Sequence, residues 1–423
     1  MVSHTEIVAT VLFAIAIVHT FSVPVFARLA DRGGTHAGLW HVLSEVEAVF
    51  GMWACVLFGW MWLTGGIGDA IHYLDSRDFT EPAFVFVIMV VAASRPIIEL
   101  VRLVVDAVAR LLPVPTALAR FFVVMTLVPL SGSLITEPAA MTLAALLLRQ
   151  SYFGRSGQDG FKYLTVGVLF VNVSIGGVLT AYAAPPVLMV AQTFGWDTAF
   201  MATHFGWRAV TAVVFNSLVL TLICRPFLLG GQLGGEVRDK RPECSRAVIG
   251  VHVLFLVAVV LASHHIHIFM ALLLLFIGYT QAYKQHQSPL LLREGLMVGF
   301  FLAGLVVLGG MQQWWLQDLL AGLSPIVLYF GATALTAITD NAALTYLGSL
   351  VEGTGELWRY MLVAGAVTGG GLTVIANAPN PAGFSILKGC FSDGTIAPLK
   401  LFGAAAVPTL VAVIMFLLPN SFS

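Results

Sequence analysis

The chain has 423 residues, of which 58% are apolar and only 10% are charged, and its formal net charge is −1. Soluble globular chains carry about 25% charged residues, so this composition excludes an ordinary soluble domain and indicates a polytopic membrane protein. The net charge identifies no partner. We expect a lipid bilayer around the chain and no nucleic acid.

Uncharged apolar runs recur along the whole chain. They cover residues 7–26, 48–63, 82–94, 121–135, 163–195, 209–223, 247–263, 268–283, 295–316, 324–338, 360–386 and 401–418. A straight helical span needs about 20 residues, and several of these runs are shorter. We therefore predict an all-α polytopic membrane protein with about ten full spans, in which the short runs form re-entrant hairpins or interrupted helices.

Basic residues predict the orientation, because loops rich in Lys and Arg stay on the cytoplasmic side. An N-terminus outside the cell places all of the 21 Lys and Arg residues inside except Arg77, Arg208 and Arg359. The acidic loop at residues 68–81 then lies outside. We predict a multi-pass protein of the cell's inner (plasma) membrane.

The first polar group of interest is HVLSEVEAV, which begins at residue 41. On a helix, His41 and Glu45 share one face, whereas Glu47 points roughly the opposite way. Acidic residues in the first turns of a helix complement its dipole, and we favour this structural role. A proton relay through His41, Glu45 and Glu47 is the alternative.

An amphipathic helix is predicted where the sequence reads RPIIELVRLVVDAVARLL. Its charged residues follow a spacing of four, three, four and four, which puts them on one helical face; they are Arg95, Glu99, Arg102, Asp106 and Arg110. We expect this helix to lie flat on the cytoplasmic surface. It is either a plain connector or an arm that links a static scaffold to a moving unit in an elevator-like transporter.

The stretch from Phe121 to Leu148 begins and ends beside basic residues that should share one side of the membrane. It must therefore enter and return, so we predict a re-entrant hairpin with its turn near Ser131 to Pro138. The turn carries the sequence TEPAAMT, residues 136–142. This places a carboxylate at the tip of the hairpin.

A near copy of this motif, TDNAALT, occupies residues 339–345. It lies within residues 324–350, between Asp318 and Glu352, and predicts a second hairpin that opens from the opposite side of the membrane. Two hairpins with opposite entry sides imply an inverted repeat.

A second pair of similar segments supports the repeat. GGVLTAYAAPP (176–186) matches GGGLTVIANAP (369–379), and in each half this segment follows the hairpin. The prolines cannot continue a helical ladder, so each segment predicts a broken transmembrane helix. We divide the chain into first-half scaffold helices with the amphipathic arm (1–120), the first-half hairpin and broken helix (121–223), second-half scaffold helices (224–323), and the second-half hairpin, broken helix and last span (324–423).

This order of hairpins and broken helices resembles the ion transporter superfamily, which includes arsenite, citrate and dicarboxylate permeases. GSLITEPAAM, TAITDNAALTYLGSLV and HVLSEVEAVFGMW are most similar to its Na+/H+ antiporter family. The resemblance covers most of the chain and implies secondary transport by alternating access. It implies that the hairpin tips and helix breaks line one cation- and proton-binding site formed by Thr136, Glu137, Thr339, Asp340, Asn341, Asn377 and Asn380.

The halves differ, because the first break reads Ala183-Ala184-Pro185 and has no amide where the second has Asn377. We therefore expect Na+ at Asp340, Asn341 and Asn377. Which of Glu137 and Asp340 is the main proton carrier stays open.

The two acidic residues indicate the sign of the charge on the transported substrate. Dicarboxylate carriers of the superfamily have neutral Ser-Asn-Thr tips, whereas each tip here carries a carboxylate. An ionised carboxylate inside a membrane costs at least about 2.5 kcal/mol, so it persists where a cation, a proton or a partner compensates it. We expect exchange of Na+ or Li+ for H+, with no cofactor beyond these transported ions and no enzymatic activity.

Three alternatives remain from the sequence. Glu137 and Asp340 could merely cap the second helix of each hairpin. The chain could carry anions or small organic acids, which the absence of a basic residue near either tip disfavours. It could also be an intramembrane enzyme with a Glu137/Asp340 pair. The sequence leaves open whether the chain forms a homodimer.

Overall fold

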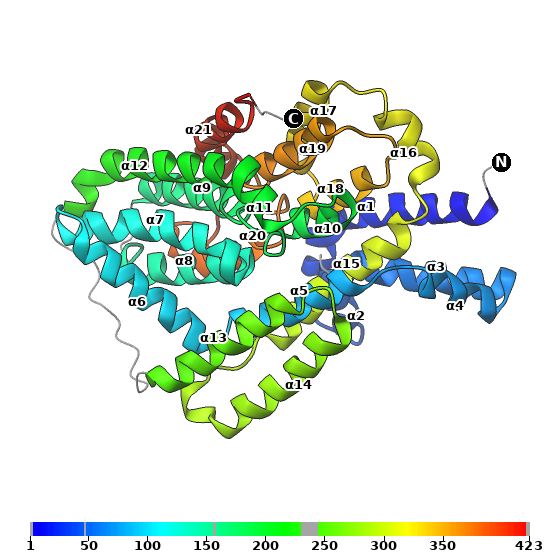
Figure 1. Cartoon of the computed structure of the whole chain (residues 1–423), viewed down its shortest axis with the longest axis horizontal. Coiled ribbons are helices and arrows are strands. Elements are labelled where there is room, and N and C mark those ends of the chain that lie inside the picture. The colour runs from blue at the N-terminus through cyan, green and yellow to red at the C-terminus, as the bar shows by residue number, and fades with distance from the viewer. Residues whose placement is uncertain (1–2, 46–47, 155–157, 230–243, 420–423) are drawn as a thin grey trace.

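The computed structural model describes residues 3–45, 48–154, 158–229 and 244–419, and these ranges contain helices and connecting turns but no strand. The all-helical prediction is confirmed. Figure 1 shows the helices in an elongated bundle in which α1 and α3–α4 extend at one end and the ends of α7 and α12 lie at the other.

Within the described residues, five stretches are long and apolar enough to cross a membrane. They are the His4–Val23 part of α1 (His4–Asp31), α7 (Thr116–Ile135), the continuous Thr198–Leu229 stretch, α15 (Leu292–Gly309) and α21 (Pro398–Phe416). A sixth span results if α5 (Thr80–Ala92) and α6 (Arg95–Leu111), bent by 65°, are counted as one.

This number is lower than the ten or so full spans predicted, because much of the apolar sequence forms shorter helices. Four of these have 10–17 residues: α3 (Val49–Gly65), α13 (Arg246–Leu261), α14 (Ile266–Ala282) and α17 (Pro325–Thr336). The other α-helices are α2 (Ala37–Leu43), α4 (Ile67–Asp75), α8 (Glu137–Ser151), α9 (Asp159–Gly176), α10 (Pro185–Phe194), α11 (Thr198–Met201), α12 (Trp207–Leu229), α16 (Gln313–Leu320), α18 (Asn341–Ser349), α19 (Glu356–Gly369) and α20 (Asn380–Leu387).

Helix α6 is the predicted amphipathic segment. Its apolar side is buried at Ile97, Val105 and Ala109, and it packs against α7 and α13. On its charged side, Asp106 forms an ion pair with Arg120 at the start of α7, with 3.2 Å between the carboxylate and guanidinium atoms. The helix is thus attached directly to the first hairpin, while its position on the cytoplasmic surface stays a prediction.

Two helix pairs occupy the places of the predicted hairpins. Helices α7 and α8 are joined by a single residue, Thr136, and pack against each other, whereas α17 and α18 are joined by residues 337–340. Helix α8 packs against α20, and α18 packs against α10 (Figure 1). Each tip helix therefore contacts the short helix that follows the break of the other half.

Both predicted broken helices are interrupted. In the first half the helix ends at Gly176 and a new helix begins at Pro185. In the second half the helix ends at Gly369 and a new helix begins at Asn380. Prolines lie in the first turns of α10 and α20. The N–H groups of a first turn make no hydrogen bond within the helix, so proline, which lacks this group, is tolerated there. Helices α9 and α19 meet just before their breaks, where the Ser174 hydroxyl donates to the Val367 carbonyl at 2.7 Å.

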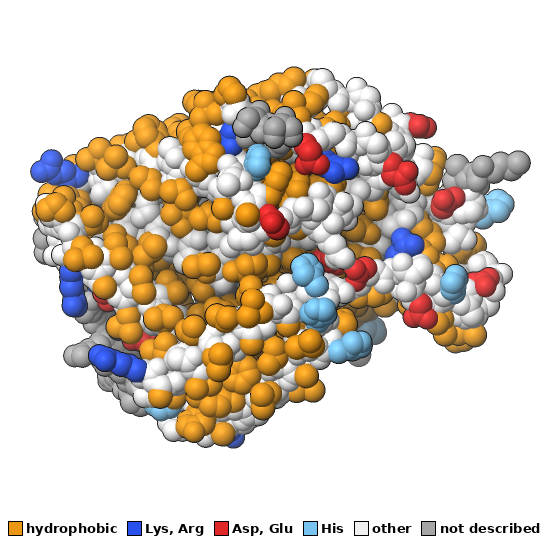
Figure 2. All heavy atoms as spheres, viewed as in Figure 1, with side chains coloured by type: hydrophobic (Ala, Val, Ile, Leu, Met, Phe, Trp, Pro, Cys, Tyr) orange, Lys and Arg blue, Asp and Glu red, His pale blue; other side chains and the backbone are white. Residues whose placement is uncertain are grey.

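Large apolar side chains cover the outside of the bundle. Leu63, Leu261, Leu399 and Val407 are each more than 65% exposed, which suits contact with lipid. Figure 2 shows this apolar surface, with several Lys and Arg side chains at the left edge of the view and most Asp and Glu in its right half.

Candidate functional site

The tip of the first hairpin holds a completely buried carboxylate. Glu137 is the first residue of α8 and is 0% exposed. Its Oε2 accepts a hydrogen bond of 2.7 Å from the Asn377 amide, which comes from the break of the second half. Its Oε1 is also buried and has no hydrogen-bond partner among the described residues. One carboxylate oxygen is thus held by the other half of the chain, and the other has no hydrogen-bond partner in the described structure.

The residue before Glu137 has an uncommon backbone conformation. Thr136 has a φ of 74°, and it is the one non-glycine residue with positive φ in the described ranges. A β-branched residue is disfavoured there, so the surrounding structure must hold it in place. The Thr136 hydroxyl is buried without a hydrogen-bond partner in the described structure. This turn reverses the chain within one residue and points Glu137 inward.

The second tip is built differently. Asp340 precedes α18 and caps it, because its Oδ1 accepts hydrogen bonds from the Ala342 and Ala343 N–H groups at 2.8 and 3.2 Å. Asp340 is half-buried. The capping interpretation of the acids therefore describes Asp340, whereas the Glu137 side chain does not cap α8.

The spatial counterpart of Glu137 is Asn341, the first residue of α18. A Cβ atom on Gly177 would overlap the Glu137 carboxylate, and one on Gly370 would come within 2.8 Å of the Asn341 amide nitrogen. Asp340 corresponds to Thr136, since both immediately precede the tip helix. The similar sequences pair Glu137 with Asp340, but the helix starts differ by one residue between the two motifs.

Buried oxygen atoms without partners gather at the tips and breaks. Buried polar groups are nearly always hydrogen-bonded, so each such atom needs an explanation, and a bound ion or water is the common one. Within the described residues these oxygens are Glu137 Oε1, Thr136 Oγ1, Thr336 Oγ1, Asn341 Oδ1, Asn377 Oδ1 and Asn380 Oδ1. Asn380 is held in place through its amide nitrogen, which donates to the Gly370 and Thr373 carbonyls at 2.7 and 2.8 Å.

Two residues of this region were not identified from the sequence. Ser133 organises the first break: its hydroxyl donates to the Gly176 carbonyl and accepts from the Leu179 N–H, at 2.7 and 2.9 Å. The residue in the matching position of the second motif is Thr336, which is 0% exposed and whose hydroxyl is among the unpartnered oxygens. The serine in GSLITEP was the available signal, because a hydroxyl three residues before a tip can bond freed backbone groups.

The remaining predicted residues have other contacts. Thr339 is half-buried, and its hydroxyl donates to the Leu335 carbonyl at 2.8 Å. Glu45 forms an ion pair with Arg293 at the start of α15 and lies 3.6 Å from the His41 imidazole. Glu47 lies outside the described residues. The ion pair favours a structural role for Glu45 over a proton relay.

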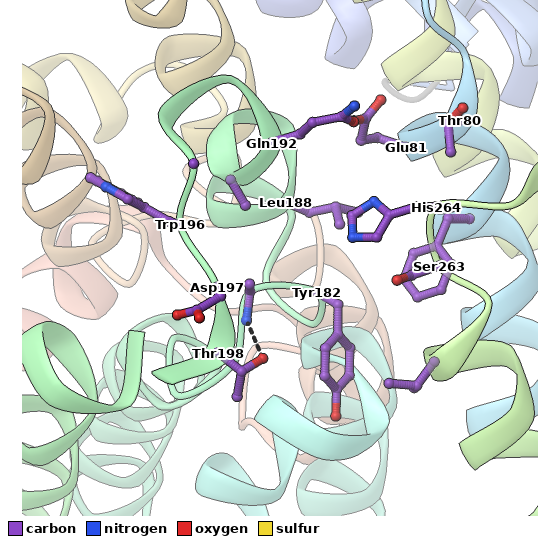
Figure 3. A pocket seen from close by; sticks show the side chains of 15 residues that line it. Thr80, Glu81, Tyr182, Leu188, Gln192, Trp196, Asp197, Thr198, Ser263 and His264 are labelled. Carbon is purple, nitrogen blue, oxygen red and sulfur yellow. Dashed lines mark hydrogen bonds between the residues drawn. The ribbon is translucent and has the colours of Figure 1, made fainter. Parts of the chain in front are cut away.

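A cavity of about 460 Å³ adjoins the first break. Figure 3 shows Glu81 of α5, Gln192 of α10 and His264 on one side of it, with Asp197 and Tyr182 on another. Tyr182 belongs to the broken segment that begins beside Glu137 at Gly177. The same segment therefore contacts the buried carboxylate at one end and a cavity lined by both polar and apolar side chains at the other.

One family model matches the chain. It is described as "Putative Na+/H+ antiporter", and the match covers residues 4–419. No curated protein matches the chain in sequence.

Proposed function

The chain belongs to this Na+/H+ antiporter family, and from that premise we propose that it exchanges Na+ or Li+ for H+ across the inner membrane at a site centred on Glu137. The antiporter family and the apolar helices make it a multi-pass membrane transporter. The observation that carries the proposal is the buried Glu137 carboxylate, with one oxygen bonded to Asn377 and the other unpartnered in the described structure.

The chemistry of exchange follows from this environment. A buried carboxylate cannot remain ionised and alone in a membrane, so it is compensated either by a proton or by a cation. A hard monovalent cation prefers oxygen ligands, and the unpartnered oxygens of Asn341, Asn377 and Thr136 are candidate ligands beside Glu137. Protons and Na+ then compete for one carboxylate, which couples their movements in opposite directions.

Asp340 contributes its charge to the same region. Its carboxylate acts electrostatically on Glu137, so the two acids together would attract a cation and repel an anion. This favours a cation over the anionic substrates of related carriers. We retain Asp340 as part of the binding region, with Glu137 as the principal proton carrier, because Asn377 is bonded to Glu137 and the Asp340 side chain caps a helix.

We also propose that the two halves form an inverted repeat that alternates access to the site. Matching contacts support it: the Thr180 hydroxyl donates to the Ser133 carbonyl in the first half, and the Thr373 hydroxyl donates to the Ala337 carbonyl in the second. An elevator-like motion would be transmitted through α6, which is ion-paired to the first hairpin.

The cavity beside the first break is the proposed aqueous approach to Glu137. Its volume of about 460 Å³ has room for several water molecules, which each occupy about 30 Å³. The carboxylates of Glu81 and Asp197 would favour cations in it over anions.

The experiment is reconstitution in liposomes that contain a pH-sensitive dye. Wild-type protein should dissipate an imposed proton gradient when Na+ or Li+ is added, and Glu137→Gln should not. Adding K+ in place of Na+ tests the cation preference, and adding dicarboxylates tests the alternative substrate class. Exchange that is unchanged in Glu137→Gln would place the site elsewhere.

A further inference from the structure

A groove of about 630 Å³ lies between the C-terminal ends of α8 and α20. One wall is the end of α8 with Phe153 and Gly154, and the other is the end of α20 with the loop that follows it as far as Gly394. The two helices approach closely, because a Cβ atom on Gly383 of α20 would lie 2.6 Å from the Met141 sulfur of α8. The groove therefore joins the first hairpin to the broken helix of the second half.

Two basic side chains from different halves of the chain line this groove. Arg149 lies in the last turn of α8, and Lys388 directly follows α20. Both are exposed, and no ion pair within the described residues uses either of them. The basic residues that do have a carboxylate partner include Arg120, Lys162, Arg293 and Arg359. We call Arg149 and Lys388 the groove cations.

The acids near the groove do not neutralise the groove cations. Asp159 accepts hydrogen bonds from the Ser392 N–H at 3.3 and 3.4 Å and lies 3.6 Å from the ammonium group of Lys162. Lys162 is 1% exposed and donates to the Cys390 carbonyl at 2.6 Å, so it adds a positive charge behind the loop. Asp393 is exposed and does not line the groove. Three basic groups therefore face two acidic ones, and the local charge is positive.

These charges select a class of ligand. At the C-terminal end of a helix each groove cation complements the helix dipole, but that role requires no groove between them. A metal cation would be repelled, and an apolar ligand would leave both cations without a partner. Ser385 adds a hydroxyl to the lining, one turn before Lys388. A phosphate group suits this set, because its several oxygens can accept from a guanidinium, an ammonium and a hydroxyl group together.

We propose that the groove binds the phosphate group of an anionic ligand, with Arg149 and Lys388 donating to its oxygens. The headgroup of an anionic phospholipid and free phosphate share this chemistry. Both groove cations lie in segments whose basic residues predict the cytoplasmic side, where anionic lipids are abundant. The inference does not rest on the exchange reaction, because neither Glu137 nor Asn377 lines the groove.

The test is titration calorimetry on the purified full-length protein in an uncharged detergent at neutral pH, without added Na+. The probes are dioctanoyl-phosphatidylglycerol, dioctanoyl-phosphatidylcholine and inorganic phosphate as its Tris salt. We expect phosphatidylglycerol to bind at least about tenfold more tightly than phosphatidylcholine, whose choline cancels the charge of its phosphate; this ratio corresponds to one charge-assisted hydrogen bond.

The probes also separate the two sources of the phosphate group. A preference for phosphatidylglycerol without binding of inorganic phosphate would identify a lipid headgroup, and binding of inorganic phosphate would identify a site open to soluble phosphate. If inorganic phosphate does not bind and the two lipids bind equally or not at all, the proposal is wrong.

A double variant locates the binding. Arg149→Gln with Lys388→Gln changes two exposed side chains, so the protein should fold, and it should weaken the probe that binds by at least about tenfold. The charge-retaining pair Arg149→Lys with Lys388→Arg should keep most of the affinity. Loss of binding in both double variants alike would contradict a site that recognises charge.

The matched control is Arg110→Gln with Lys284→Gln, which changes the net charge equally. Arg110 lies in the last turn of α6, and Lys284 begins a short 3-10 turn after α14, as Lys388 does after α20. Both control residues are exposed, and neither lines the groove. The control should bind as wild type does. Equal losses in the groove variant and the control would show that the probe responds to net charge, which would overturn the proposal.

Glu137→Gln separates this proposal from the proposed function. It should abolish exchange and leave phosphate binding unchanged, because its side chain lies outside the groove. Phosphate binding that survives Arg149→Gln with Lys388→Gln would contradict the assignment to this groove, even if the exchange reaction is as proposed.

Discussion

The two hairpin tips have similar sequences but different structures. At the first tip the carboxylate of Glu137 is fully buried and accepts a hydrogen bond from an amide of the other half, and its second oxygen has no hydrogen-bond partner among the described residues. At the second tip the carboxylate of Asp340 is half-buried and satisfies the first N–H groups of α18. Two acids in similar motifs therefore have different contacts, because the tip helix starts at Glu137 in the first motif and one residue after Asp340 in the second.

Glu137→Gln is the strongest test of this difference. Glutamine has nearly the same shape but cannot hold a proton or a negative charge, so exchange should fall to the rate of protein-free liposomes. The measurement is the dye signal after addition of Na+, with size-exclusion chromatography as the control for folding. Near-wild-type exchange at neutral pH in this variant would indicate that Glu137, like the capping Asp340, has only a structural role.

Asn377→Ala should have the next largest effect. It removes the amide that donates to Glu137, and hydrogen bonds to charged groups contribute about 1.5–3 kcal/mol. The apparent affinity for Na+ should therefore weaken by about ten- to a hundredfold, measured as the Na+ concentration that gives half-maximal exchange.

The control for Asn377→Ala is Ala184→Ser, at the first break, where the chain has no amide. It should change the apparent affinity much less. Equal effects of the two variants would show that the breaks of the two halves contribute alike.

Gly177→Ala tests how closely the first break approaches the carboxylate. The added Cβ would overlap the end of the Glu137 side chain, so the carboxylate must move and the variant should lose about 1–3 kcal/mol of stability together with part of its Na+ affinity. The two measurements are the thermal unfolding temperature and the Na+ concentration that gives half-maximal exchange.

The matched control for Gly177→Ala is Gly250→Ala in α13, where an added Cβ would meet nothing within 4 Å. It should leave both readouts unchanged or raise stability slightly, because alanine favours helix over glycine. If Gly177→Ala behaves like this control, the close packing against Glu137 does not constrain the site.

Asp340→Asn should have the smallest effect on exchange. Asparagine can also cap α18, so stability should be retained, and exchange should persist with a weaker attraction for cations. Asp340→Ala removes the cap and should cost about 1 kcal/mol of unfolding free energy, measured by thermal or denaturant unfolding. If Asp340→Asn abolishes exchange as fully as Glu137→Gln, the two tips are functionally equivalent despite their different contacts.

Several features could be predicted from the sequence because they depend on local composition. The low charge content and repeated apolar runs predicted a helical membrane protein, and the prolines after residues 184 and 378 predicted where the two helices are interrupted. The motifs TEPAAMT and TDNAALT predicted the turns between α7 and α8 and between α17 and α18. Each of these rests on the chemistry of a few neighbouring residues.

The tertiary structure alone decided what the two acids contact. Asn377 was expected beside Asp340, which is nearer in sequence, but its amide reaches Glu137, 240 positions away, because α8 packs against α20. The start of each tip helix depends on how the turn before it is held, as the positive φ of Thr136 shows. Burial and hydrogen bonding of a side chain are set by distant segments. Sequence similarity between the motifs therefore could not distinguish a buried carboxylate that is hydrogen-bonded to Asn377 from a carboxylate that caps a helix.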